Sequence, residues 1–325
     1  MGEFDLIARY FTRPVHRAAL GVGDDCALLA PAAGMQLAVS SDMLVEGRHF
    51  FADVDPEALG HKALAVNLSD LAACGARPLA FTLALALPRV DESWLAGFSR
   101  GLLDLADAHG CELVGGDTTQ GPLNICITVF GEVPAGQALL RSGARAGDDL
   151  YVSGTLGDAR LALEALLGNT ALPSEVLAAA RLRLEQPTPR VALGLALRGL
   201  ASSAMDVSDG LLGDLSHILK ASGVGARIDT SITATLMAHA GAAASPEQRH
   251  QCTLAGATTT SWPSRRRPRS ARQWPRPHRP ARPRWRASAA SRRIRDCAWW
   301  MGKAGRWSST TPRSTISADE IFFAA

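Results

Sequence analysis

The sequence predicts a mixed α/β (α+β) protein of two domains followed by a segment of different character. Three observations lead to this prediction. The chain has 325 residues, of which 47% are hydrophobic, enough for two domains with cores of their own. Helical and strand-like stretches alternate through residues 1–256. The charge then changes sign, because residues 1–256 carry 18 Lys and Arg against 28 Asp and Glu, and residues 257–325 carry 16 against 3.

The first domain is expected over residues 1–135. Asp55 and Pro56 fit the N-cap and the first residue of a helix that Gly75 ends. Apolar runs predict the strands, and an apolar stripe predicts a helix that ends near Gly110. In chain order we expect a helix over 4–11, a strand around 37–39, a helix over 56–74, a strand over 79–87, a helix over 94–109, and strands at 112–114 and 125–129.

The second domain is expected over residues 136–256, because the Pro- and Gly-containing stretch 133–147 is the best boundary. It should open with a strand at 150–152, continue with three helices over 161–167, 176–184 and 191–200, and contain a short strand that ends at Met205. A helix should follow from about Leu211. Residues 257–325 are rich in Arg, Pro and Trp and support no helical or strand period, so we expect them to be disordered.

Composition also bears on location and on the cysteines. No apolar run reaches the roughly 18 residues of a membrane-spanning helix, and the N-terminus lacks the pattern of a signal peptide. We therefore expect a cytoplasmic protein without a membrane partner. The six cysteines form no C-x-x-C pair, so we expect free thiols instead of disulfides or a zinc site.

Acidic residues flanked by small residues follow apolar strands at Asp42, Asp117 and Asp206. Ligand sites in open α/β sheets lie beyond the carboxyl ends of strands, so these acids could face a common crevice. Carboxylates within about 6 Å of one another repel unless cations intervene. Mg²⁺ takes one or two carboxylates and completes its shell with water and phosphate oxygens. The sequence therefore predicts several magnesium ions beside a polyphosphate, although it contains no Walker or protein-kinase motif.

Each motif also has a simpler interpretation. The Gly-Asp-Asp that begins at Gly23 recurs at Gly147, where a turn is sufficient to explain it. Residues 208–210 (Ser-Asp-Gly) fit the N-cap of the following helix equally well. His49 and Arg141 fit ordinary surface side chains. No single motif decides the function.

Seven motifs taken together are more specific. They are GVGDDCA at 21–27, SSD at 40–42, GRHF at 47–50, AVNLSDLAA at 65–73, GGDTT at 115–119, RSGA at 141–144 and MDVSDGL at 205–211. In order and spacing this set resembles the bacterial thiamine-monophosphate kinases. The resemblance implies a two-domain aminoimidazole-ribonucleotide-synthetase-like fold, with an N-terminal domain that pairs in a homodimer and a C-terminal α/β domain that completes an ATP cleft. It implies transfer of the γ-phosphoryl group of ATP to thiamine monophosphate, giving thiamine diphosphate and ADP.

The resemblance also implies a role for each matching residue. His49 would contact thiamine monophosphate. Gly116, Asp117, Arg141 and Ser208 would contact ATP. The implied magnesium ligands are Asp25, Ser40, Ser41, Asp42, Asp70, Asp117, Asp206 and Asp209. No general base is implied, since a phosphate oxygen that is already ionised needs none.

The chain departs from this family after Gly256. The family continues with Gly-Asp/Glu-Asp-Tyr-Glu-Leu and supplies an acid that contacts the substrate, whereas residues 256–262 read GATTTSW. Loss of one G from GC-rich codons for Gly-Gly-Asp-Asp-Tyr-Glu-Leu produces this string. We therefore interpret residues 257–325 as a frameshifted tail that leaves the C-terminal domain incomplete. We expect the altered C-terminus to impair the activity of this chain.

Two alternatives remain open from the sequence. The chain could be another ATP-using enzyme of the same superfamily, such as a phosphoribosyl-aminoimidazole or selenophosphate synthetase. The basic tail with its tryptophans could instead bind nucleic acid through phosphate neutralisation and base stacking. Charge composition alone supports only non-specific binding, so we do not expect a nucleic-acid partner.

Overall fold

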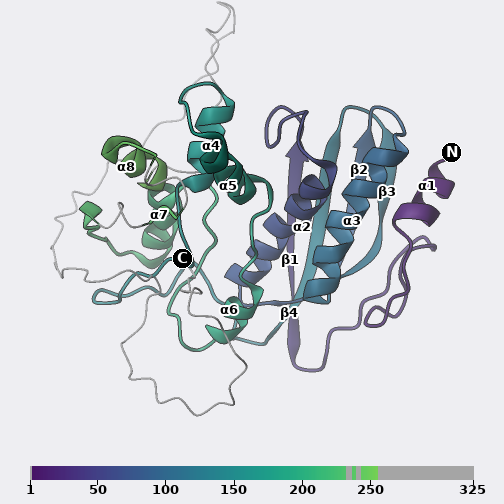
Figure 1. The fold of residues 1–325 in the computed structure, drawn as a ribbon. Coiled ribbons are helices and arrows are strands. Elements are labelled where there is room, and N and C mark those ends of the chain that lie inside the picture. Colours follow the sequence, from purple (N-terminus) through teal and green to yellow (C-terminus); the bar gives the residue numbers. More distant parts are fainter. Residues whose placement is uncertain (1, 232–235, 239–242, 255–325) are drawn as a thin grey trace, which may run out of the picture.

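The structure is a computed structural model that describes residues 2–231, 236–238 and 243–254. Its centre is a four-stranded sheet with the strand order β1-β4-β2-β3 (Figure 1). The strands are β1 (Met35–Val45), β2 (Arg77–Leu87), β3 (Glu112–Gln120) and β4 (Asn124–Pro134). β4 is antiparallel to β1 and to β2, and β3 is parallel to β2. The predicted tail at 257–325 and the family departure after Gly256 lie outside the described residues.

Helices α2 (Pro56–Ala73) and α3 (Glu92–His109) cover one face of the sheet (Figure 1). The helices predicted over 56–74 and 94–109 are both confirmed, and their first and last residues agree to within two positions. The Asp55 carboxylate accepts the Ala58 N–H at 3.0 Å, and Gly110 ends α3 in the left-handed conformation. The largest fully buried side chains between these helices and the sheet include Phe81 and Phe98. This face holds the main core of the molecule.

The two helices pack with their backbones in contact. A Cβ atom at Gly60 would stand 2.0 Å from the Phe98 carbonyl oxygen, and one at Gly101 would stand 1.9 Å from the Glu57 carbonyl oxygen. Only glycine allows this approach. The contact places α2, and therefore Asp70 near its C-terminal end, at a defined depth over the sheet.

The opposite face of the sheet is covered only in part. At the β2–β3 side, α1 (Glu3–Tyr10) leads into a segment whose apolar residues pack on the sheet. Toward β1 the described residues leave the face bare, because Leu37, Val39 and Met43 are 44%, 56% and 50% exposed. An apolar strand surface of this kind is typical of a protein interface.

The second half of the described chain is helical. It contains α4 (Asp158–Leu166), α5 (Ser174–Glu185), α6 (Val191–Ala196), α7 (Leu211–Ser222) and α8 (Pro246–Leu254). The first four match predicted helices, although α6 is shorter than expected, and α8 was not predicted. Gly194 of α6 packs directly on α2, since a Cβ atom there would stand 2.0 Å from the Ala72 carbonyl oxygen.

The two strands predicted in this half are wrong for the described residues. Residues 150–152 and the residues that lead to Met205 are not part of any strand. A strand requires a run of hydrogen bonds to a neighbouring strand. Before Met205 a single backbone bond, from the Ala204 N–H to the Leu140 carbonyl at 2.9 Å, joins two described segments, which is not enough to form a strand. Leu150, Val152 and Met205 instead enter an apolar cluster under α7.

Two further predictions can be compared with the described part of the chain. Five cysteines fall within it and all are free thiols, as expected. None of the helices described is both long enough and apolar enough to cross a membrane.

Candidate active site

A cavity of about 650 Å³ lies between one end of α2, strand β1 and the helical half of the chain. Most of the predicted site residues line it. They are Ser40, Asp42, His49, Asp70, Arg141, Asp206, Ser208 and Asp209. Residues more than 160 positions apart in the sequence therefore share one cavity.

Alternation along β1 decides which side chains reach this cavity. Ser40 and Asp42 lie on the face that α2 covers, where the Ser40 hydroxyl donates to the Asp70 carboxylate at 2.5 Å. The Asp42 backbone N–H donates to the Asn67 side-chain oxygen at 3.2 Å. Asn67 and Asp70 are one turn apart on α2, so a single helix face positions both residues of the strand.

Three carboxyl groups from three parts of the chain interact electrostatically in this cavity. Burial raises the pKa of Asp206 to about 6, and the neighbouring charges of Asp70, Asp214 and Asp42 add to the effect. Burial also raises the pKa of Asp42, with a contribution from Asp70. The pKa of Asp70 is raised by burial, while Ser40 and Arg141 act against this shift. The cavity therefore concentrates negative charge that a cation would relieve.

The loop at 206–210 is held by a residue that sequence reasoning missed. The buried Asp214 carboxylate accepts the backbone N–H groups of Ser208 and Asp209, each at 2.9 Å. Gly210, without a side chain, is the N-cap of α7, so the interpretation of residues 208–210 as a side-chain N-cap is wrong. The Ser208 and Asp209 side chains are exposed at the cavity instead.

Arg141 lines the same cavity, and its positive charge interacts with the carboxylate of Asp70. Its backbone carbonyl accepts the Ser203 hydroxyl at 2.9 Å and the Ser222 hydroxyl at 3.1 Å. Two serines from different segments thus fix the main chain at this position. A guanidinium beside the acids is suited to bind a phosphate.

His49 lies in a short loop after β1 that a buried lysine supports. The His49 Nδ1 atom accepts the Val45 N–H at 3.0 Å, and the His49 carbonyl accepts Lys62 Nζ at 2.9 Å. Burial, together with Lys62 and Arg48, lowers the pKa of His49. Burial lowers the pKa of Lys62 to about 8, and Glu185 of α5 acts against this shift.

Lys62 also lines the cavity, and the sequence offered a signal for it. It lies three residues after Leu59 and four before Val66, on the apolar face of a predicted helix. A lone charge on such a face is buried and needs a partner. Asp214 carried no comparable signal, because its role depends on how residues 206–210 turn back toward α7.

The structure does not bring four of the predicted site residues into this cavity. Asp25, Gly116 and Asp117 line a separate cavity of about 560 Å³ beside α1. The Ser41 hydroxyl lies 3.1 Å from the Ile127 carbonyl oxygen and 3.0 Å from Thr128 Oγ1.

Sheet geometry explains the separation. Met43, Cys126, Ala84 and Asp117 pair successively across the sheet, so Asp117 lies on the same face as Met43 and opposite to Asp42. Three strand spacings, about 14 Å, add to this separation. Asp42 and Asp117 also lie within strands β1 and β3 and not at their ends, so the expected common crevice does not form from these two acids within one chain.

Gly116 has a packing reason for being glycine. Its φ is 150°, and a Cβ atom would stand 1.8 Å from the Leu83 carbonyl oxygen of the neighbouring strand. Any side chain would separate β2 from β3 at this point. Asp117, which is exposed, is the next residue along the strand after this tightly paired glycine.

The donor chemistry of both cavities fits a hard cation only in part. Among the described residues, no group of three or more His, Cys, Asp or Glu side chains could by itself hold a metal ion. The carboxylates and the serine hydroxyl near Asp70 are nevertheless oxygen donors of the kind that Mg²⁺ prefers. Because Mg²⁺ often takes only one or two carboxylates, a bound polyphosphate could complete its shell.

Comparison with known proteins is consistent with this geometry. Residues 23–133 match the family model described as AIR synthase related protein, N-terminal domain, and residues 145–250 match the corresponding C-terminal domain. Thiamine-monophosphate kinase of Salmonella typhimurium is 54% identical over 234 residues, which are 70% of this chain and 71% of the relative. The chain belongs to the thiamine-monophosphate kinase family.

Solved structures of this family resemble the chain in three dimensions. The crystal structure of thiamine-monophosphate kinase from Stenotrophomonas maltophilia K279a has a TM-score of 0.70 and 46% identity, and the match covers 78% of this chain and 81% of that one. AaThiL complexed with AMPPCP and TMP has a TM-score of 0.56 and 35% identity, with 60% and 63% covered. The expected fold class is confirmed.

Proposed function

We propose that this chain is an ATP-dependent kinase that transfers the γ-phosphoryl group of ATP to the phosphate of thiamine monophosphate, in thiamine diphosphate biosynthesis. The observation that carries the proposal is the cavity in which Asp42, Asp70 and Asp206 interact beside Arg141. A family relative complexed with AMPPCP and TMP supports both ligands. Two anionic reactants must meet in line, so the site has mainly to position them and to neutralise charge.

We assign the residues of this cavity as follows. Asp42, Asp70, Asp206 and Asp209 would hold Mg²⁺ with the Ser40 hydroxyl, and the cation would supply charge neutralisation for the phosphates. Arg141 and Ser208 would bind the nucleotide phosphates. His49, in the loop that Lys62 supports, would contact thiamine monophosphate.

The other implied residues form a second group on the opposite face. Asp25 and Asp117 would serve a further magnesium ion, with Gly116 and Asp117 near the nucleotide. Their support is the shared cavity that they line. The Ser41 hydroxyl lies beside main-chain and side-chain oxygens of β4, so we favour Ser40 as the hydroxyl ligand.

We infer that the protein is a homodimer that pairs through the bare sheet face of the N-terminal domain. The support is the row of exposed apolar residues on β1, namely Leu37, Val39 and Met43. We retain the boundaries 1–135 and 136–256 for the two domains, and a cytoplasmic location, where ATP and phosphorylated metabolites are available.

The decisive experiment measures thiamine diphosphate formed from thiamine monophosphate with ATP and Mg²⁺. The chain should be assayed beside a version with the reading frame restored at Gly256, with aminoimidazole precursors and selenide as alternative acceptors. We expect product from thiamine monophosphate alone and a higher rate in the restored version. No product from either version would refute the proposal, and equal rates would refute the frameshift interpretation of impaired activity.

A further inference from the structure

The loop that carries Asp25 lies outside the helices and strands of the fold. It is closed at its base by backbone pairing between Leu20 and Leu28, with the Leu28 N–H donating to the Leu20 carbonyl at 3.0 Å. At its tip the Asp24 carboxylate accepts the Asp25 N–H at 2.8 Å. Such a short exposed loop needs external contacts to keep a carboxylate in one place.

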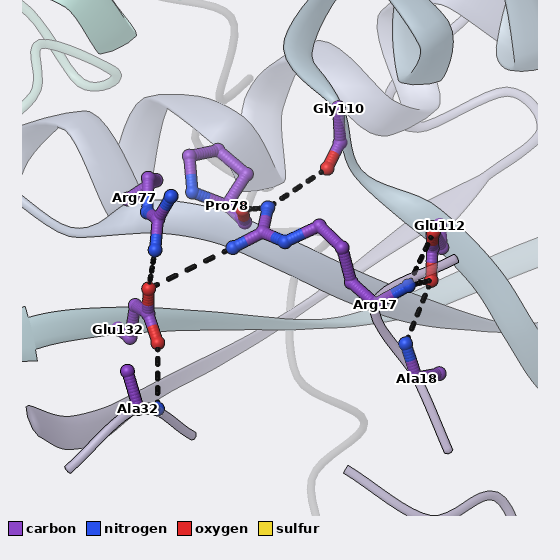
Figure 2. A network of polar contacts seen from close by, with 8 residues as sticks. All are labelled: Arg17, Ala18, Ala32, Arg77, Pro78, Gly110, Glu112 and Glu132. Carbon is purple, nitrogen blue, oxygen red and sulfur yellow. Dashed lines mark hydrogen bonds and ion pairs between the residues drawn. The ribbon is translucent and has the colours of Figure 1, made fainter. Parts of the chain in front are cut away.

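Glu112 provides the first contact, before the loop begins. Its carboxylate accepts the backbone N–H groups of His16 at 2.7 Å, Arg17 at 2.9 Å and Ala18 at 2.9 Å (Figure 2 shows those of Arg17 and Ala18). Burial opposes the charged form of Glu112, but the three N–H groups outweigh it and lower the pKa. One side chain at the start of β3 thus holds three successive residues of the segment.

Glu132 provides the second contact, after the loop ends. This glutamate is only 2% exposed, and its Oε2 atom accepts the Ala32 N–H at 3.2 Å. Its Oε1 atom bonds to the Arg77 guanidinium and lies 3.7 Å from Arg17 Nη2 (Figure 2). Separating the arginines from Glu132 would leave its buried carboxylate without a cationic partner, so this contact resists opening.

Arg17 links the two contacts. Its backbone N–H is held by Glu112, and its guanidinium reaches toward Glu132 while Nη1 donates to the Pro78 carbonyl at 2.7 Å (Figure 2). Below these polar contacts, an apolar cluster fixes the same segment to the sheet. It contains Val15, Ala18, Ala27 and Leu29 packed against Leu79, Ala80, Val114 and Phe130.

We propose that Glu112 and Glu132 are positioning residues that hold the loop at 20–28 so that Asp25 stands beside Asp117. The inference rests on the proposed role of these two aspartates in binding a divalent cation. Glu112 and Asp117 belong to the same strand, β3, and Asp117 lines one cavity with Asp25 of the loop. The residue that fixes the loop and the second acid of this cavity therefore stand on one rigid element. By accepting three backbone N–H groups, Glu112 fixes the path of the main chain, which an ordinary ion pair between two surface side chains does not do.

The test uses the full chain and Mn²⁺ as a probe, with bound and free ion measured by electron paramagnetic resonance. Glu112→Ala should weaken Mn²⁺ binding about tenfold, as should Asp25→Asn. The double variant should bind no more weakly than Asp25→Asn alone, since Glu112 acts through Asp25. Additive losses would show a general structural effect and overturn the inference.

Two further variants keep the test decisive. Glu112→Gln retains an oxygen acceptor for His16 and Arg17, so it should recover part of the binding even if Glu112→Ala does not fold. The matched control is Glu92→Ala, which removes an exposed ion pair of the same N-terminal region, Arg9–Glu92 at 2.9 Å, and should leave Mn²⁺ binding unchanged. Equal binding by Glu112→Gln, Glu132→Gln and the unaltered chain would refute a positioning role.

Hydrogen exchange gives a readout that is independent of the cation. Amides of residues 20–28 should exchange at least several-fold faster in Glu112→Gln than in Glu92→Ala. Mn²⁺ binding requires neither ATP nor thiamine monophosphate, so a chain without kinase activity would still answer the question. If Asp25→Asn leaves Mn²⁺ binding unchanged in a chain that does form thiamine diphosphate, this inference fails and the proposed function stands.

Discussion

The two faces of the central sheet differ in how completely one chain builds them. On the α2 side, Ser40 and Asp42 meet Asp70 from a helix that glycine contacts hold against α3. On the other side, Asp117 is exposed, and the described part of the chain leaves Leu37, Val39 and Met43 of β1 exposed. The α2 face therefore holds a cavity whose acidic residues already interact with one another. The acids of the opposite face, Asp25 and Asp117, would be brought into use by a bound ligand or a partner surface.

This difference teaches that one strand can serve two sites. Neighbouring residues of β1 point to opposite faces, so the Ser40-Ser41-Asp42 motif divides between them. The α2 face should respond to changes in charge within the cavity. The bare face should respond to changes in association.

The largest expected effect is that of Asp70→Asn on the α2 face. Because Asp70 interacts with Asp42, Asp206 and Arg141, its charge is central to cation and phosphate binding in the proposed site. We expect kcat to fall about 10²–10³-fold, the range seen when one electrostatic group of an active site is removed. Steady-state thiamine diphosphate formation measures this loss.

A matched control separates charge from fold. Asp104→Asn changes an exposed carboxylate of α3 and should leave kcat unchanged. The unfolding temperature of Asp70→Asn should equal or exceed that of the unaltered chain, because repulsion among the acids is relieved. A folded Asp70→Asn variant with full activity would contradict the assignment of this face.

The second expected effect is a pH dependence of stability that originates at Asp206. Its pKa rises from 3.8 to about 6 on folding, so its favourable contribution is complete below about pH 4 and is lost as the pH rises through about 6. The penalty at neutral pH is at most about 3 kcal/mol. Asp206→Asn should therefore stabilise the metal-free protein at pH 7.5 and change little at pH 4.

Chemical denaturation at the two pH values measures this difference. Added Mg²⁺ should reduce the advantage of Asp206→Asn, since a bound cation favours the charged carboxylate. A variant that is less stable at pH 7.5 than the unaltered chain would show that Asp206 does not carry a buried charge penalty.

Much of the α2 face could be predicted from the sequence. Capping residues such as Asp55 and Gly110 and the apolar spacing of α2 and α3 are local signals, and the structure confirms the elements that they predict. Five separate motifs supplied the cavity residues. The contribution of Asp214 could not be predicted, because it depends on hydrogen bonds to a loop whose path is set by tertiary packing.

The prediction that Asp42 and Asp117 share a crevice did not hold within one chain, for a definable reason. Their motifs look alike, but a shift of one residue in a strand moves a side chain to the opposite face. The sequence shows the strand and not its register. The strands predicted at 150–152 and before Met205 were wrong because pairing requires a neighbouring segment, which a local pattern cannot show.

The third expected effect concerns the bare face. Val39→Lys places an ammonium group at a residue that is 56% exposed, in the row of exposed apolar residues with Leu37 and Met43. Burying this charge in a dimer costs about 3 kcal/mol or more, so the dissociation constant of the dimer should rise roughly 100-fold. Sedimentation equilibrium measures the change. Leu182→Lys, at an exposed residue of α5, should leave the association unchanged.

The smallest expected effect compares two neighbouring serines and sharpens the contrast between the faces. Ser40→Ala removes the hydrogen bond to Asp70, a bond to a charged group worth about 1.5–3 kcal/mol, so half-saturation should require about tenfold more Mg²⁺. Ser41→Ala removes a hydroxyl that lies beside Ile127 and Thr128 on the other face, so the Mg²⁺ requirement should change by about twofold or less. Rates measured across a range of Mg²⁺ concentrations distinguish the two variants. If Ser41→Ala had the larger effect, the hydroxyl ligand would lie on the bare face of the sheet. The proposed division of the Ser40-Ser41-Asp42 motif between two sites would then be wrong.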